Sequence, residues 1–237
     1  MEILRVVVHA LILAFLVRTF LYQPFNIPSG SMKSTLLVGD YLFVSKFSYG
    51  YSQYSLPFSP SLFSGRVWTG APTRGDVAVF KLPTDNSTDY IKRVIGLPGD
   101  RIQVLDGVLH INGKAVERKK VDDFVEGDDA GNVRRIQRYQ ETLPNGVTYR
   151  TLDLYTASPG DNTREYVIPD RHYFMMGDNR DNSTDSRFLN DVGYVPVENF
   201  VGRADIIFFS IEGSGRFWEF WRWPAAIRWG RLFNLVD

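Results

Sequence analysis

The sequence predicts a mainly β protein: an antiparallel β-sheet domain with an inserted subdomain, an N-terminal transmembrane helix and a Trp-rich, membrane-associated C-terminal tail. Three observations support this. An apolar run opens the chain, short β-rich runs separated by Gly, Pro and Asp follow it, and four of the five Trp lie near the end. With 44% hydrophobic and 23% charged residues, the chain is also too apolar for wholesale disorder.

Residues 1–22 are predicted to form a membrane anchor. The run at residues 3–22 is apolar, and as a helix it rises roughly 30 Å, the thickness of a bilayer core. Arg5 and Arg18 lie near its two ends, where long side chains reach the interface. A buried amphipathic core helix is the alternative. The run ends in bulky residues before Pro24, which favours an uncleaved anchor over a cleavable secretion signal.

The β-rich part is predicted to be one domain in two pieces, residues 23–112 and 166–211. A loop or flap without periodicity is expected at residues 47–71. Candidate strands are residues 41–47, 76–82, 90–95, 101–105, 108–111, 173–176 and 204–210.

Residues 113–165 and 212–237 differ from the rest in composition. The first stretch mixes charges and is expected to be a solvated inserted subdomain without catalytic residues. In the second, Trp alternates with Arg, a pairing that suits the lipid headgroup layer. We therefore expect residues 212–237 to associate with the membrane, with packing back onto the domain as the alternative.

Composition narrows the chemistry. The 27 Lys and Arg balance 27 Asp and Glu, which argues against a nucleic-acid binder. The absence of Cys excludes disulfides, Cys-based zinc sites and thiol nucleophiles, and only three His are present. We expect no metal and no cofactor, and we expect hydroxyls, carboxylates and lysines to carry any reaction.

Two segments place a hydroxyl or a lysine in surroundings that suit catalysis. In PSGSM, Ser29 and Ser31 flank Gly30, so that the backbone can turn sharply and present a hydroxyl beside a free amide. In DYIKRVIGLPGD, Lys92 is flanked by apolar neighbours. An ammonium held against apolar groups loses hydration and its pKa falls, as a general base near neutral pH requires.

A third segment, YFMMGDNRDNSTDSRF at residues 173–188, follows an apolar strand with alternating carboxylates and arginines. Such a loop can be a solvated turn. It can also form an ion-paired frame that holds one hydroxyl, Ser183, in position.

Taken in order, the segments SGSM, RGDVAVFK, YIKRVIGLPGD and MGDNRDNSTDSR resemble those of bacterial type I signal peptidases, also called leader peptidases. The resemblance runs from about Phe25 to Asp205 and is loose after Phe47 and after Gly113. It implies a membrane-anchored serine endopeptidase with a Ser/Lys dyad.

Carried onto this chain, the resemblance makes Ser31 the nucleophile and Lys92 the general base. It places the Ser29 hydroxyl in the oxyanion hole beside the amide of Ser31. It also implies that Ser183 forms a hydrogen bond with Lys92 and fixes its direction.

Other residues acquire supporting roles by the same match. Asp178 should pair with Arg93, and Asp185 with Arg187. The positions where the family lines its shallow substrate pockets are Ile27, Pro28, Met32, Leu36, Tyr90 and Ile91.

Three departures stand out. The family usually has Pro two residues after the Met of the first segment, where this chain has Ser34. Many relatives carry a second spanning helix, which this chain does not show. Microsomal relatives place His at the position of Lys92, so the bacterial type is favoured.

The resemblance implies removal of signal peptides from exported preproteins by cleavage after small residues, usually Ala-x-Ala. The expected partners are signal peptides and the lipid bilayer, near the export machinery. The expected location is the bacterial plasma membrane, crossed once, with the catalytic domain outside. A narrow-client peptidase for pilin or conjugation precursors, or a non-catalytic preprotein-binding membrane protein, remains an alternative.

Overall fold

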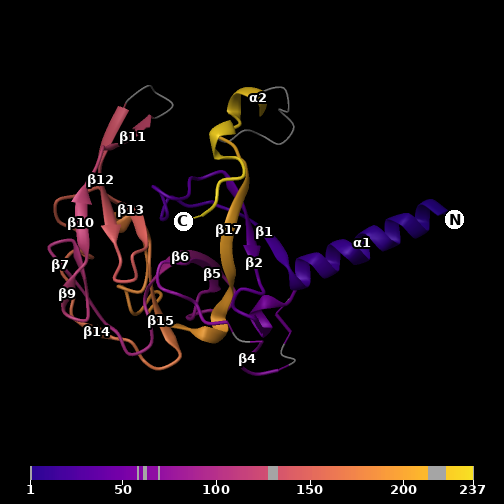
Figure 1. Cartoon of the computed structure of the whole chain (residues 1–237), viewed down its shortest axis with the longest axis horizontal. Coiled ribbons are helices and arrows are strands. Elements are labelled where there is room, and N and C mark those ends of the chain that lie inside the picture. The colour runs from indigo at the N-terminus through magenta and orange to yellow at the C-terminus, as the bar shows by residue number, and fades with distance from the viewer. Residues whose placement is uncertain are drawn as a thin grey trace.

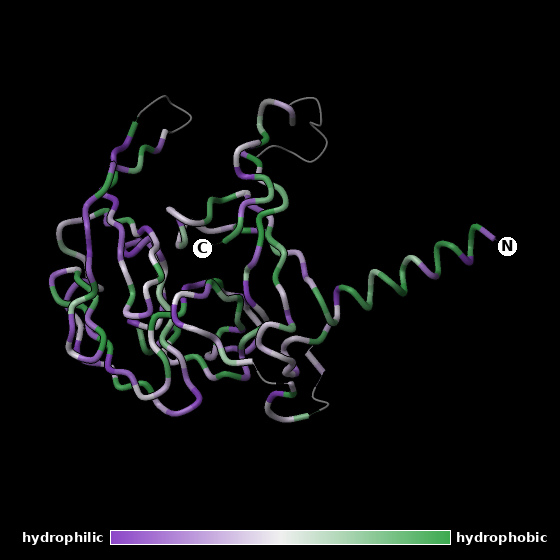
Figure 2. The backbone as a smooth tube through the Cα atoms, in the orientation of Figure 1, coloured by the Kyte–Doolittle hydropathy of each residue, from purple (hydrophilic) through white to green (hydrophobic). Residues whose placement is uncertain are grey.

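The computed structural model describes residues 2–57, 59–60, 63–68, 70–127, 133–212 and 223–236. Helix α1 (Glu2–Phe20) extends away from a β-rich body, with the N-terminus at its far end (Figure 1). Its surface is apolar and exposed along nearly the whole length, and Thr19 is its only buried residue (Figure 2). Within the described ranges, α1 alone is long and apolar enough to cross a membrane.

The helix ends at Phe20, two residues earlier than expected. Tyr22 already belongs to β1 (Tyr22–Asn26), whose residues pair with an antiparallel neighbour. Pairing satisfies the main chain here in place of helical hydrogen bonds, and Pro24 is accommodated because β1 is an edge strand.

The largest sheet has seven strands in the order β1-β2-β17-β5-β6-β15-β16. Every neighbouring pair in it is antiparallel. Its other strands are β2 (Asp40–Ser45), β5 (Val77–Lys81), β6 (Asp89–Gly96), β15 (His172–Met176), β16 (Val195–Pro196) and β17 (Phe200–Ser210). The five strands predicted in this region are confirmed, and the mainly β fold with them.

The structure also contains two four-stranded sheets. One contains β7 (Arg101–Leu105), β8 (Val108–Ile111), β9 (Lys114–Ala115) and β14 (Tyr166–Val167). The other contains β10 (Glu117–Lys120), β11 (Phe124–Gly127), β12 (Val133–Thr142) and β13 (Thr148–Asp153). The predicted strands 101–105 and 108–111 are confirmed.

Both faces of the large sheet are covered, because alternate residues of each strand enter different cores. Val79 and Ile207 pack with Met32 in one cluster, whereas Phe80 and Val94 belong to another. A third cluster joins β15 of the large sheet to the two smaller sheets, with Tyr149 of the insertion buried in it. The insertion therefore shares a core with the rest of the protein.

The stretch expected as a loop at residues 47–71 contains β3 (Tyr51–Ser52), the 3₁₀ turn η1 (Gln53–Ser55) and β4 (Arg66–Val67). It is anchored rather than free. The Tyr51 hydroxyl donates to the Phe20 carbonyl at the end of α1, and Arg66 donates to the Phe200 carbonyl.

The described end of the chain contains α2 (Trp223–Ala226) and the 3₁₀ turn η5 (Trp229–Arg231), and two further 3₁₀ turns are η2 (Arg180–Asn182) and η3 (Val197–Asn199). The last residues return along β17: the Phe233 amide donates to the Ile207 carbonyl at 2.7 Å, and Arg231 forms an ion pair with buried Asp40. Part of the Trp-rich tail, residues 213–222, lies outside the described residues. Membrane association of the tail stays a prediction.

Candidate active site

Ser31 is presented by a tight turn whose flanks are fixed in the core. The Lys33 amide donates to the Gly30 carbonyl at 3.0 Å, and the Leu36 amide to the Met32 carbonyl at 2.8 Å. Met32 and Leu36 are fully buried in the cluster beneath the turn. Their burial fixes the turn and, with it, the position of Ser31. Within the described chain, the Ser31 amide donates no hydrogen bond.

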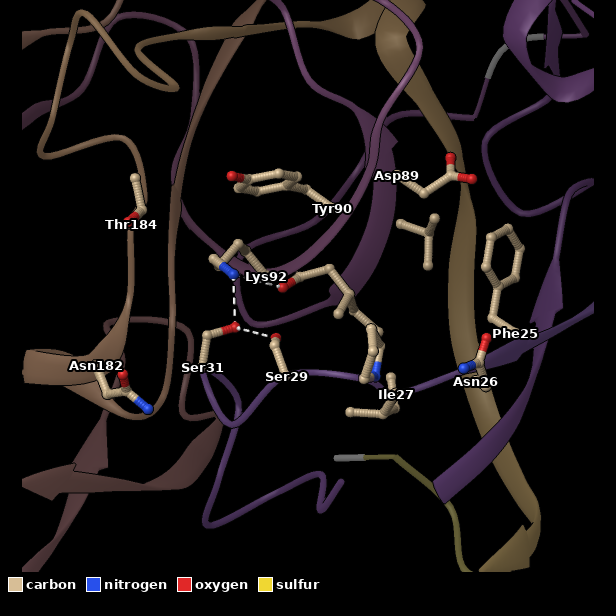
Figure 3. Close-up of a pocket in the computed structure, with 13 residues that line it drawn as sticks. Phe25, Asn26, Ile27, Ser29, Ser31, Asp89, Tyr90, Lys92, Asn182 and Thr184 are labelled. Atoms are coloured by element: carbon tan, nitrogen blue, oxygen red, sulfur yellow. Dashed lines mark hydrogen bonds between the residues drawn. The ribbon is translucent and has the colours of Figure 1, made fainter. Parts of the chain in front are cut away.

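Lys92 reaches this serine from β6. Its Nζ lies 2.7 Å from Ser31 Oγ and donates at 3.1 Å to its neighbouring carbonyl, that of Ile91 (Figure 3). The Tyr90 ring covers the ammonium, with its centroid 5.1 Å from Nζ. Burial lowers the pKa of Lys92 from 10.5 to about 8, against the opposing effect of Asp185 and Asp178. The side chain is only 4% exposed.

Ser29 lies on the side of Ser31 away from Lys92. Its Oγ is 3.3 Å from Ser31 Oγ, so the three side chains Ser29, Ser31 and Lys92 form a continuous row (Figure 3). The Ser29 hydroxyl therefore lies within reach of the Ser31 side chain, and the Ser31 amide has no hydrogen-bond acceptor among the described residues.

The loop after β15 clamps the serine turn. Asn179 donates from its amide to the Ser31 carbonyl at 3.0 Å and from its side chain to the Gly30 carbonyl at 2.9 Å. Gly177 makes the approach possible, since a Cβ there would lie 2.6 Å from the Ser31 carbonyl oxygen and 2.2 Å from Ser183 Oγ. Sequence reasoning missed both roles, although both residues belong to the MGDN motif.

Ser183 is buried near the site but does not bond Lys92. Its hydroxyl donates to Asp185 Oδ2 at 2.8 Å, and the same oxygen accepts from the Gly177 amide at 3.0 Å. Among the described residues, the Lys92 ammonium bonds only Ser31 and the Ile91 carbonyl. The hydrogen bond expected between Ser183 and Lys92 is therefore not made: the Ser183 hydroxyl is directed to Asp185, and the Lys92 ammonium to Ser31 and Ile91.

Both expected ion pairs are present and buried. Arg93 donates to both carboxylate oxygens of Asp178 at 3.0 and 2.8 Å. Arg187 donates to both oxygens of Asp185, each at 2.9 Å. Burial alone would raise the pKa of Asp185, but Arg187 and the neighbouring donors lower it, so this carboxylate stays ionised.

The insertion contributes a third buried pair that the sequence did not indicate. Glu141 of β12 accepts from Arg180 Nη1 at 2.9 Å and from the Tyr149 hydroxyl at 2.7 Å. The Arg93 guanidinium lies over the Tyr149 ring, 4.4 Å from its centroid. The expectation of a solvated insertion was wrong in this respect: β12 and β13 brace the loop that clamps Ser31.

A cleft of about 460 Å³ opens beside the row. Four of the six expected pocket residues line it: Ile27, Pro28, Tyr90 and Ile91. Met32 and Leu36 do not, because both side chains are turned into the core. The lining residues that the sequence did not single out are Phe25, Asn26, Val79, Asp89, Asn182 and Thr184.

Within the described ranges, no group of three or more His, Asp or Glu side chains is arranged to hold a metal ion.

The family model described as "Signal peptidase, peptidase S26" matches residues 1–209. A protein named Signal peptidase I from Rickettsia prowazekii (strain Madrid E) is 45% identical over 208 residues, covering 84% of this chain and 76% of the relative. One of the same name from Rickettsia canadensis (strain McKiel) is 44% identical with the same coverage.

Among solved structures, a signal peptidase I from Enterococcus faecalis V583 is similar at 23% identity and a TM-score of 0.33. The match covers 56% of this chain and 97% of that one.

Proposed function

The chain belongs to the signal peptidase family, peptidase S26, and we propose that Ser31 and Lys92 form the dyad with which it removes signal peptides from preproteins. It is a serine peptidase, hence a hydrolase. The observation that supports the dyad most directly is the 2.7 Å contact between Ser31 Oγ and a buried lysine whose pKa falls to about 8.

The reaction begins with neutral Lys92. A serine hydroxyl is a poor nucleophile until a base removes its proton. Lys92 accepts that proton as Ser31 Oγ attacks the carbonyl at the cleavage site, and then delivers it to the leaving amine. The signal peptide stays attached as an ester of Ser31. Lys92 next deprotonates a water, whose oxygen attacks the ester and frees the serine.

Charge develops on the carbonyl oxygen during both attacks. The proposed donors to that oxygen are the Ser31 amide, which has no other acceptor among the described residues, and the Ser29 hydroxyl, whose oxygen lies 3.3 Å from Ser31 Oγ. Five further residues support the dyad, because their buried hydrogen bonds fix the segments next to it. They are Arg93, Asp178, Asp185, Arg187 and Ser183.

An extended substrate fits the cleft as an added strand. Residues 89–92 of β6 pair with β5 on one edge, while the pairing with β15 ends at Arg93, so their other edge has no strand partner among the described residues. The opposite wall of the cleft is formed by the segment that follows β1 in the chain. Among the described residues, β1 pairs only with β2. Two unpaired edges can bind a peptide main chain, and shallow contacts with Ile27, Tyr90 and Ile91 then favour small side chains such as those of Ala-x-Ala.

The chain is membrane-anchored, and α1 is the segment that fits this role. Only nine residues separate Tyr22 from Ser31, so an extended linker keeps the serine within about 30 Å of the membrane surface. We place the protein in the bacterial plasma membrane with its catalytic domain on the outer side, where preproteins arrive tethered by their own apolar segments. Tethering raises their local concentration, so weak side-chain contacts suffice.

The test is cleavage of a lipid-reconstituted preprotein with an Ala-x-Ala site by the wild type, Ser31→Ala and Lys92→Ala, with product termini read by mass spectrometry. We expect a cut after the second Ala that both variants lose. Cleavage by Lys92→Ala at near wild-type rate would overturn the dyad. Cleavage confined to one client would favour a dedicated peptidase, and none at all by the folded wild type would favour a preprotein binder.

A further inference from the structure

A second cavity, of about 450 Å³, continues the active-site cleft toward the membrane anchor. We call it the upstream cavity. The two hollows share Phe25 and Asp89 in their walls. The remaining lining is mainly apolar and includes Phe15 of α1 together with Tyr54 and Leu56 at and just after η1.

The upstream cavity lies on one defined side of the cut. In Figure 3, Phe25 and Asp89 are on the side of the dyad opposite Asn182 and Thr184. Ser31 follows Phe25 by six residues, which is about 20 Å of extended chain. A peptide lying along the segment from Phe25 to Ser31 reaches the upstream cavity about six residues from the cleavage site. The cavity leads toward α1 and so toward the membrane that holds the substrate's apolar segment, which precedes the cut; the residues that reach the cavity are therefore those before the cleavage site.

The anchor helix is fixed against the body where it meets this cavity. The Tyr51 hydroxyl donates to the Phe20 carbonyl, and the Lys46 amide donates to the Leu21 carbonyl at 3.0 Å. The Phe20 and Tyr51 rings also pack edge to face, with centroids 6.0 Å apart. These contacts hold Phe15 and Arg18 at the mouth of the cavity.

Charge at the cavity is unbalanced. Lys81 and Asp89 neutralise each other at 2.9 Å. Arg18 also lines the cavity, and among the described residues it makes no hydrogen bond or ion pair. Buried Lys46 lies close enough that Arg18 affects its titration. The site is therefore an apolar hollow with an uncompensated cation at its membrane end.

We propose that the upstream cavity binds the last turn of the substrate's apolar signal helix, with Arg18 facing the helix's terminal carbonyls. The last four carbonyls of a helix lack intrahelical partners, and its C-terminus carries partial negative charge that a cation stabilises. The substrate then changes from helix to extended strand at Phe25, where the upstream cavity meets the cleft. This rests on the proposed function and extends it from the cleavage site to the helix before it.

The experiment compares two peptides in the same detergent micelles with the full-length enzyme. The short peptide begins four residues before an Ala-x-Ala cut and so stops short of the upstream cavity, and the long one adds a fifteen-residue apolar helix. The variants are Arg18→Gln and Tyr54→Ala, with Arg5→Gln as a matched control because it removes the same charge from the far end of α1.

We expect Arg18→Gln to lower kcat/KM for the long peptide about fivefold, mostly through KM, and to leave the short peptide unchanged. Tyr54→Ala should act in the same direction, and Arg5→Gln should match the wild type. Equal losses on both peptides, or equal effects of Arg18→Gln and Arg5→Gln, would overturn the proposal. Failure of the wild type to cut even the short peptide would instead refute the proposed function.

Discussion

Two lysines, Lys92 and Lys46, are buried in different parts of the molecule, and only one contacts a hydroxyl. Lys92 is 4% exposed and Lys46 is 1% exposed, and burial lowers the pKa of each to about 8. Lys92 Nζ meets Ser31 Oγ, whereas Lys46 Nζ donates to the main-chain carbonyl of Ser55. A carbonyl has no proton to give up, so Lys46 has nothing to activate.

Their charged neighbours differ as well. The carboxylates of Asp185 and Asp178 raise the pKa of Lys92 against the larger effect of burial. At Lys46 the second effect after burial is Arg18, which lowers the pKa further. A lowered lysine pKa therefore marks burial in both regions. In the proposed function it serves catalysis only at Lys92, where a serine hydroxyl and a cleft adjoin the lysine.

The largest expected effect separates the two lysines by activity. A general base typically raises a rate about 10²- to 10⁴-fold, so Lys92→Met should lower kcat by at least about 100-fold. Lys46→Met should keep activity on a short peptide within about twofold. Initial rates measured side by side in detergent provide the check, and equal losses would show that the comparison is wrong.

The pH dependence of the rate should report Lys92 alone. The base is active when neutral, so activity should rise with pH, reach half of its plateau near pH 8, and lie about tenfold below the plateau at pH 7. The profile of kcat/KM for Lys46→Met should superimpose on that of the wild type. A shifted limb in that variant would mean that the two lysines are coupled.

Asp185→Asn should move this limb to lower pH. Removing the carboxylate takes away an effect that raises the pKa of Lys92, and it leaves the Arg187 charge, which lowers that pKa. The plateau should also fall several-fold, because Arg187 loses its partner. The exposed residue Asp191, changed to Asn, serves as the control; a limb that stays put, or moves to higher pH, would contradict the assignment.

The smallest effect concerns stability. The folded pKa of Lys46, about 8, lies below its unfolded value of 10.5, so between these limits the unfolded chain binds more protons. Unfolding free energy should therefore rise as pH increases from about 8 to 10.5. Lys46→Met should show a smaller rise when both proteins are unfolded by denaturant in detergent. An equal rise in both proteins would mean that a group other than Lys46 causes it.

Local pattern was enough to identify much of this protein. The length and hydropathy of the first residues indicate α1, and short β-rich runs bounded by Gly, Pro and Asp located seven strands. The dyad candidates could be named because Ser31 and Lys92 lie in short sequence motifs that resemble those of a known family. All of these features are carried by residues close together in the chain.

The burial of a side chain depends on which element packs against it, and only the tertiary structure decided this. Met32 and Leu36 turn into the core because β-strands cover them, and Lys46 is buried by the segment at residues 51–55. Glu141 meets Arg180 across thirty-nine residues. The alternation of a strand gives two faces but does not say which neighbour covers each. Burial, and with it the lysine pKa and the shape of both cavities, is set by long-range packing.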